Sequence, residues 1–67
     1  MNTTQLRCFL SVAEYLSFAR AAEQLNMTQP AISHQISSLE KELDVQLFVR
    51  TTRSVTLTEE GSIFIND

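Results

Sequence analysis

Apolar residues recur at helical spacing through the first part of the chain. One stripe follows i, i+3, i+4, i+7 and i+10 and comprises Leu6, Phe9, Leu10, Ala13 and Leu16. This spacing predicts an amphipathic helix over about residues 3–16, with Thr3 or Thr4 as its N-cap. A second, shorter stripe comprises Phe18, Ala21, Ala22 and Leu25. Because Ser17 interrupts the pattern and can cap a helix, we expect a second helix over about residues 18–25.

A third and longer helix is predicted over Thr28–Leu43. Its large apolar residues are Ile32, Ile36, Leu39 and Leu43. On a helix that advances about 100° per residue, these four lie within roughly 60° of one another, so we expect them to face the core. The other side carries polar residues and one proline, namely Gln29, Pro30, Ser33, His34 and Ser37.

This polar side carries no charge between Thr28 and Ser38. A solvated helix face usually carries charged residues, often as i,i+4 pairs. Hydroxyls, amides and an imidazole suit a partner that has its own hydrogen-bond donors and acceptors, and base edges in a DNA major groove are one such partner. A plain solvent-exposed face is the alternative that the pattern leaves open.

The connection between the second and third helices is predicted to be a three-residue turn. Asn26 tolerates the left-handed conformation at a helix end, and Thr28 can cap the next helix. Pro30 then falls in the first helical turn, where its missing N–H costs nothing. Two helices joined in this way form a helix-turn-helix.

After Leu43 the pattern changes from helix to strand. Residues 47–50 and 55–58 are predicted to pair as a hairpin, and residues 51–54 form its polar tip. A hairpin beside a helix-turn-helix is a wing. Thr58 can cap a last helix, whose apolar side begins with Ile63, Phe64 and Ile65. Since the chain stops at Asp67, we expect this helix to be cut short and the chain to be a fragment.

Composition narrows the class of protein. The chain has 67 residues, 43% of them hydrophobic, with one glycine and one proline, which favours one small, compact, mainly helical domain. No apolar run exceeds three residues, so we expect no membrane span, and the single cysteine favours the cytoplasm. The net charge of −3 argues against strong nonspecific binding of nucleic acid. This objection weakens because the wing contains Arg50 and Arg53, while the polar face of the third helix contains no acid.

Catalysis and metal binding have little support. Ser33 and His34 are adjacent, so they diverge on a helix, and no acid is placed to orient the imidazole. The one cysteine, Cys8, is far from the one histidine and is expected to be a packing residue. We therefore expect no enzymatic activity, no metal and no cofactor.

A characteristic set of residues occurs in order along the whole chain. It comprises Leu6, Phe9, Val12-Ala13-Glu14, Ser17-Phe18, Ala21-Ala22, Leu25, Gln29-Pro30-Ala31-Ile32-Ser33, Gln35-Ile36, Leu39-Glu40, Leu43, Leu47-Phe48, Arg50-Thr51-Thr52-Arg53, Leu57-Thr58 and Gly61. This set resembles the N-terminal winged helix-turn-helix domain of LysR-type transcriptional regulators of bacteria. Three positions depart from the family's pattern: His34 replaces a usual arginine, Asp44 a usual glycine and Val49 a usual acid.

The resemblance implies a mainly α fold: a three-helix core, a two-stranded β-hairpin wing and the start of a fourth, linker helix. It divides the chain into a DNA-binding domain, residues 1–58, and the start of a linker and dimerisation helix, residues 59–67. It also implies a double-stranded DNA operator as partner, and a homodimer or tetramer for the full-length protein. A small-molecule effector would bind only through a C-terminal domain that is absent here.

The resemblance and the residue pattern together indicate the DNA-binding residues. On the recognition helix, residues 28–43, they are Thr28, Gln29, Pro30, Ser33, His34 and Ser37. On the wing they are Arg50, Thr51, Thr52 and Arg53, with Arg50 expected at phosphate and Arg53 in the minor groove. Ser17 and Arg20 are further candidates for phosphate contacts. The rival interpretation is a winged-helix protein–protein or dimerisation module without DNA binding, which the acidic charge and His34 would suit.

Overall fold

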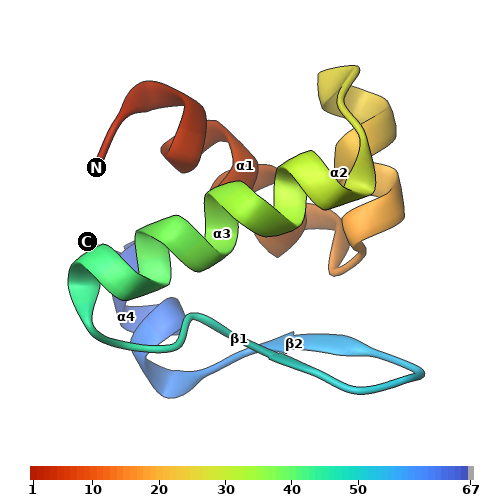
Figure 1. Ribbon diagram of the computed structural model, residues 1–67. Coiled ribbons are helices and arrows are strands. Elements are labelled where there is room, and N and C mark those ends of the chain that lie inside the picture. Colours follow the sequence, from red (N-terminus) through yellow and green to blue (C-terminus); the bar gives the residue numbers. More distant parts are fainter. Residues whose placement is uncertain (67) are drawn as a thin grey trace.

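The computed structural model describes residues 1–66, which form four helices and a two-stranded antiparallel sheet (Figure 1). In chain order the elements are α1 (Thr3–Tyr15), α2 (Phe18–Leu25), α3 (Gln29–Leu43), β1 (Phe48–Arg50), β2 (Val55–Leu57) and α4 (Glu59–Asn66). The expected mainly α winged helix-turn-helix is confirmed. The last residue assigned to the linker helix, Asp67, lies outside the described residues.

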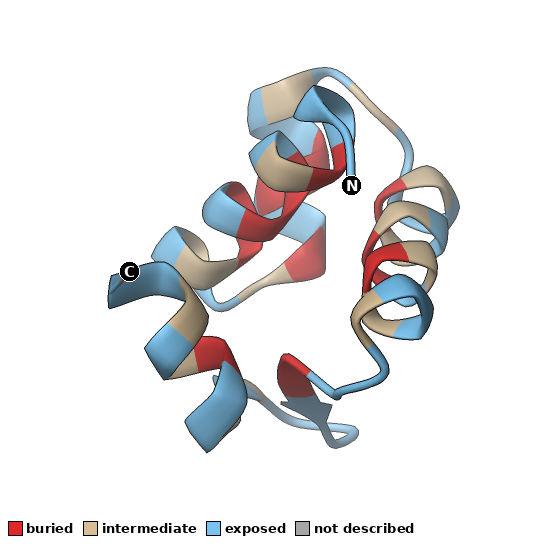
Figure 2. Cartoon of the chain, turned by 90° about the vertical axis from the view of Figure 1, so that its left-hand side faces the viewer, coloured by how far each residue is buried: buried red, intermediate tan, exposed pale blue. Residues whose placement is uncertain are grey.

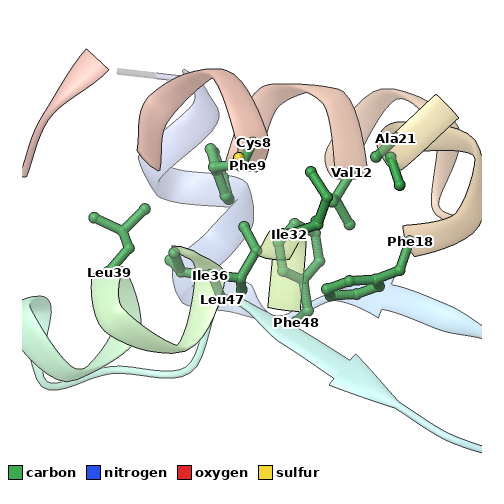
Figure 3. Packing of buried hydrophobic residues seen from close by; sticks show 11 residues of the cluster. Cys8, Phe9, Val12, Phe18, Ala21, Ile32, Ile36, Leu39, Leu47 and Phe48 are labelled. Atoms are coloured by element: carbon green, nitrogen blue, oxygen red, sulfur yellow. The ribbon is translucent and has the colours of Figure 1, made fainter. Parts of the chain in front are cut away.

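The core lies where the first three helices meet the beginning of the hairpin (Figure 3). Its buried apolar members are Cys8, Phe9, Val12, Phe18, Ala21, Ala22, Ile32, Ile36, Leu39, Leu47 and Phe48. The inward stripe predicted for α3 is confirmed at Ile32, Ile36 and Leu39, whereas Leu43 is only partly buried at the margin of the core. Figure 2 shows the buried residues on the facing sides of the helices.

The inward face of α1 differs from the predicted stripe. Leu10 is 52% exposed and Leu16 is 45% exposed, while Gln5, Cys8 and Val12 are buried. The core-facing stripe is thus rotated toward Gln5, which follows the same helical spacing. Gln5 can be buried because its amide donates to Ser38 Oγ at 3.1 Å, so its polar atoms do not lose their hydrogen bonds.

The N-cap of α1 is Asn2, so the expected cap at Thr3 or Thr4 is wrong. Asn2 Oδ1 accepts from the backbone N–H of Gln5 at 2.8 Å, and Gln5 Oε1 accepts from the backbone N–H of Asn2 at 3.0 Å. This reciprocal pair is a capping box. It satisfies two backbone donors, whereas a cap at Thr3 or Thr4 would be followed three positions later by Leu6 or Arg7, neither of which has a side-chain acceptor.

The turn between α2 and α3 has the predicted form. Asn26 is left-handed, with φ of 58°, and its N–H donates to carbonyls of the last turn of α2. Thr28 then caps α3 by accepting from the backbone N–H of Ala31 at 3.2 Å. Pro30 occupies the first turn, as expected. Asp44 ends α3 in the left-handed conformation, with φ of 57°, at the position where the family usually has glycine.

The base of the hairpin is joined to the start of α4. Phe48 pairs with Leu57 and Arg50 with Val55, so the tip begins directly after Arg50. Thr58 Oγ1 donates to Gln46 O at 2.6 Å and accepts from Gly61 N–H at 3.0 Å, which joins the start of α4 to the chain before β1. A Cβ on Gly61 would lie 2.3 Å from Leu47 O, so only glycine allows this close approach.

Only one side of α4 packs against the core. Phe64 packs edge-on against Phe9, with ring centroids 5.2 Å apart, whereas Ile63 is 56% exposed. Ile65 is also exposed, so the predicted apolar run divides between the core and the surface. None of the helices within residues 1–66 has the length and apolar content that crossing a membrane requires.

Candidate functional site

The outer face of α3 presents the polar residues that the sequence predicts. Gln29, Pro30, His34 and Ser37 are exposed, and Ser33 is half-buried. Thr28 is exposed as well, but its hydroxyl oxygen already accepts the capping hydrogen bond. The face therefore offers an amide, an imidazole and two serine hydroxyls, with no charged side chain among them.

Three elements meet at an open depression on this side of the molecule, which we call the wing cleft. It has a volume of about 420 Å³ and is lined by Leu16, Ser17, Phe18, Ala19, Gln29, Ser33 and residues 50–55. The start of α2, the start of α3 and the wing therefore face one space. In Figure 1 the tip of the hairpin points toward the side on which α3 begins, away from both chain ends.

The wing cleft gathers part of the predicted site. It brings together Gln29, Ser33, Ser17 and all four predicted wing residues. Thr28, Pro30, His34 and Ser37 do not line it and lie outside it on α3. Arg20 lines a different depression with Tyr15, Glu23 and Gln24, so it is set apart from the wing cleft.

The tip of the wing is an ordered turn. Thr51 Oγ1 accepts from the backbone N–H of Ser54 at 3.0 Å and of Arg53 at 3.2 Å. The backbone N–H of Thr51 donates to Ser54 O at 2.8 Å, which closes the turn. The Thr51 hydroxyl is thus committed to shaping the tip. Thr52 and Arg53 are exposed, and the guanidinium of Arg53 has no ion pair within residues 1–66.

Arg50 connects the wing to both helices of the helix-turn-helix. Its Nη1 donates to Ser33 Oγ on α3 at 3.0 Å. Its guanidinium carbon lies 4.2 Å from the ring centroid of Phe18 on α2, in a cation–π arrangement. The sequence indicates Arg50 as a site residue but does not reveal these two contacts. Ser33 lies 17 positions before Arg50 and Phe18 lies 32 positions before it, and no local pattern links residues so far apart.

The acids among residues 1–66 lie away from the wing cleft. Glu14 is on α1, Glu59 and Glu60 are on α4, and the acids of α3 are confined to its last turns and its C-cap. Glu23 is near the end of α2 and lines the separate depression that contains Arg20. The lining of the wing cleft includes Arg50 and Arg53 but no acid. The net charge of −3 therefore does not describe this face, which is locally positive and suits an anionic partner.

Cys8, the other side chain considered for chemistry, packs in the core, as predicted. Burial raises the pKa of its thiol, while the nearby Arg7 lowers it to a smaller degree. A raised pKa leaves less of the reactive thiolate at neutral pH. Within residues 1–66 no three side chains of the metal-ligating types gather at one point.

Glu40 has a role that the sequence did not reveal. Its Oε2 accepts from the backbone N–H of Leu47 at 2.7 Å and of Phe48 at 3.3 Å. These two residues carry the chain into β1. The carboxylate therefore fixes the beginning of the wing to α3, at the end opposite to the Arg50–Ser33 hydrogen bond.

Comparison with known proteins gives one consistent result. Residues 3–62 match the family described as bacterial regulatory helix-turn-helix protein, lysR family. The chain is 52% identical over 66 residues to the HTH-type transcriptional regulator AlsR of Bacillus subtilis strain 168, covering 98% of this chain and 22% of that protein. It is 55% identical over 62 residues to the glycine cleavage system transcriptional activator of Escherichia coli strain K12, covering 92% of this chain and 20% of that protein. The chain thus spans about a fifth of the length of these relatives.

Solved structures agree with these relatives. The CbnR DBD in complex with DNA superposes with a TM-score of 0.95 at 40% identity, covering 100% of this chain and 77% of that chain. The BenM DBD in complex with benA site 1 DNA superposes with a TM-score of 0.93 at 44% identity, covering 98% of this chain and 74% of that chain. With the family match spanning most of the sequence, the chain belongs to the LysR family of bacterial helix-turn-helix regulators.

Proposed function

We propose that this chain is the DNA-binding domain of a bacterial LysR-type transcriptional regulator and binds double-stranded DNA sequence-specifically. The observation that carries the proposal is the wing cleft, where α2, α3 and the wing present arginines, hydroxyls and an amide without an acid. The CbnR and BenM structures, which superpose closely on this chain, contain DNA, and this supports the proposal.

In the proposed complex α3 enters the major groove with its first turns leading. An α-helix fits the width of this groove, and each base pair presents a distinct pattern of donors and acceptors there. Gln29 can make two hydrogen bonds to an adenine, and Ser33 can bond to several bases. Pro30, His34 and Ser37 lie on the same exposed side of α3 and contact the bases or the flanking backbone.

The wing and the helix starts contact the DNA backbone. The exposed Arg53 at the tip reaches phosphate or a narrow minor groove, where the potential is most negative. Thr52 beside it can donate to phosphate, and Thr51 acts by shaping the turn. Thr28 and Ser17 place the N-terminal ends of α3 and α2 near phosphates, which helix dipoles favour. Arg20 would reach only a phosphate outside the wing cleft.

For the whole regulator we propose the family's organisation. Residues 1–58 form the DNA-binding domain, and residues 59–67 begin a linker helix through which a homodimer or tetramer forms. The exposed Ile63 and Ile65 on α4 suit such a partner helix. Two copies of α3 would then enter successive major grooves about 34–36 Å apart. An effector would bind a C-terminal domain, the protein would act in the cytoplasm, and no catalysis is proposed.

A protein–protein or dimerisation module without DNA binding is the second candidate. The net charge of −3 and His34, at a position where the family usually has arginine, favour it. Two features weigh against it: the outer face of α3 carries no charge, and the wing cleft contains no acid. Binding of a protein partner would leave both features unexplained.

A fluorescence-anisotropy titration separates the two. We expect this chain to bind a labelled nonspecific duplex weakly at low salt, with two or three phosphate contacts and hence a slope of log K against log salt of about −2 to −3. Glu59→Gln on α4 is the control for general changes in charge and should bind at least as well as the parent. Absence of binding at low salt, even at high protein concentration, would favour the protein–protein module.

A further inference from the structure

Arg50 is the point at which α2, α3 and the wing meet, and its guanidinium is held from two sides. Phe18, on which the guanidinium stacks, is only 7% exposed. The Phe18 ring in turn packs edge-on against Phe48, with centroids 6.2 Å apart, and Phe48 is buried. The stacking platform is therefore part of the core and does not move independently of it.

The other contact of Arg50 is the hydroxyl of Ser33. The neighbouring residue on α3, Ile32, is fully buried, so the backbone beneath Ser33 is also fixed by the core. Nη1 of Arg50 lies 3.0 Å from Oγ of Ser33. No carboxylate within residues 1–66 pairs with Arg50, so no anion draws the guanidinium away from the hydroxyl.

The chemistry of the two groups fixes the direction of this hydrogen bond. A guanidinium has five N–H donors and no acceptor, whereas a serine hydroxyl has one hydrogen and two lone pairs. Ser33 Oγ must therefore accept from Arg50, and its own hydrogen must point elsewhere. In the described part of the chain no acceptor receives that hydrogen, so it is free to donate into the wing cleft.

We infer that Arg50 is a specificity-determining positioning residue, which orients the Ser33 hydroxyl as a donor toward the base that faces it. This inference rests on the proposed function. In the major groove guanine presents two acceptors, adenine and thymine present one each, and cytosine presents only its amino donor. Cytosine is disfavoured opposite Ser33 because it presents no acceptor for the hydroxyl hydrogen, and its amino hydrogens would have to share the hydroxyl oxygen with a positively charged guanidinium that already donates to it. Arg50 keeps four further N–H donors, which leaves it able to contact a phosphate as well.

In vitro selection from a randomised duplex library, read by sequencing, tests the inference with this chain and its variants. Ser33→Ala first identifies the base position that Ser33 faces, as the position whose preference it removes. At that position we expect the parent to favour guanine over cytosine by about five- to tenfold, which is within the range of one good base contact. Arg50→Met keeps an unbranched side chain on Phe18 but cannot donate, and it should reduce this ratio to about twofold or less.

Two further variants and a double variant separate positioning from a phosphate contact. Arg53→Met removes a wing cation that does not touch Ser33, so it should weaken all duplexes and leave the guanine-to-cytosine ratio unchanged. Arg50→Gln, which can accept as well as donate, should relax the ratio as Arg50→Met does, and it replaces that variant if Arg50→Met fails to fold. In a Ser33→Ala background, Arg50→Met should change no base preference.

The outcomes distinguish failure of the inference from failure of the proposed function. A parent that enriches a site, with a ratio that survives Arg50→Met and Arg50→Gln, overturns the inference and makes Arg50 a phosphate contact only. A parent site at which Ser33→Ala alters no preference also overturns it, while DNA binding stands. A parent that enriches no sequence overturns both.

Discussion

Replacing Glu40 with alanine should loosen the attachment of the wing to α3 and destabilise the whole domain. The Glu40 carboxylate accepts a short hydrogen bond from the Leu47 N–H, at 2.7 Å, and a longer one from the Phe48 N–H, at 3.3 Å. Leu47 and Phe48 are buried, so water cannot readily replace the lost acceptor. The substitution therefore leaves a buried backbone donor unpaired rather than exchanging one partner for another.

The magnitude follows from one strong and one weak hydrogen bond to a charged group. A hydrogen bond to a charged group contributes roughly 1.5–3 kcal/mol, so the loss for Glu40→Ala should be about 2–3 kcal/mol. A chain of this length has a free energy of unfolding of about 3–10 kcal/mol in total, so the loss is a large share of it. With about 4–8 °C per kcal/mol for a domain of this size, the melting temperature should fall by roughly 10–20 °C.

Thermal denaturation followed by circular dichroism measures this effect. Lys41→Ala is the matched control, since Lys41 is the exposed neighbour on the same helical turn, and it should change stability by less than about 0.5 kcal/mol. Glu40→Gln retains an acceptor oxygen without the charge and should fall between the two. If Glu40→Ala and Lys41→Ala melt within a degree or two of each other, the carboxylate does not hold the wing.

Three further predictions concern the core, the close contact of α4 with Leu47, and the separate roles of α3 and the wing in DNA binding. Ile36→Asp should abolish the cooperative melt, because it buries an unpaired charge in a small core, and a melt like that of the parent would contradict the orientation of α3. Gly61→Ala should destabilise the domain by about 1–3 kcal/mol, since its Cβ overlaps Leu47 O, and unchanged stability in urea denaturation would contradict that close approach. In competition binding at several salt concentrations, Gln29→Ala should cost about 1–3 kcal/mol on the preferred site and relax base discrimination, whereas Arg53→Ala should weaken all sequences evenly and flatten the salt slope by about one. Equal losses and equal salt slopes for both variants would contradict this division of roles.

The helix-turn-helix could be predicted from the sequence because its determinants are local. The stripe of α3 is unbroken through Ile32, Ile36 and Leu39, and the core receives all three. Asn26 and Thr28 define the turn through backbone conformation and capping, which depend on neighbouring residues only. On α3 and at this turn the apolar pattern and the local chemistry agree, and the structure follows the prediction there.

The inward face of α1 could not be predicted because it contains two polar residues, whose burial depends on hydrogen bonds to residues far along the chain. Gln5 donates to Ser38, and Ser11 donates to Gln24 Oε1 at 2.6 Å. These contacts satisfy the polar groups at the core, so the helix rotates toward them and leaves Leu10 in solvent. A stripe counted from apolar residues alone misses this outcome.

The residues of the candidate site could be named from the sequence, but the contacts among them could not. The charge-free side of α3 and the arginines of the wing were evident in the sequence. The contacts of Arg50 with Phe18 and Ser33 join the wing to α2 and α3, and the hydrogen bonds of Glu40 join α3 to the chain entering β1. Such contacts depend on how the elements pack, and no local pattern records them.

Amide chemical-shift mapping by nuclear magnetic resonance tests the central claim most directly, because it identifies the face that meets DNA even when binding is weak. The chain labelled with nitrogen-15 is titrated with a short duplex at low salt. We predict that the largest shifts cluster at residues 28–37, at residues 50–54 and around Ser17, while α1 and α4 change little. Shifts concentrated on α1 or α4, or no shifts at saturating duplex, would contradict the assignment of α3 and the wing cleft as the DNA-binding face.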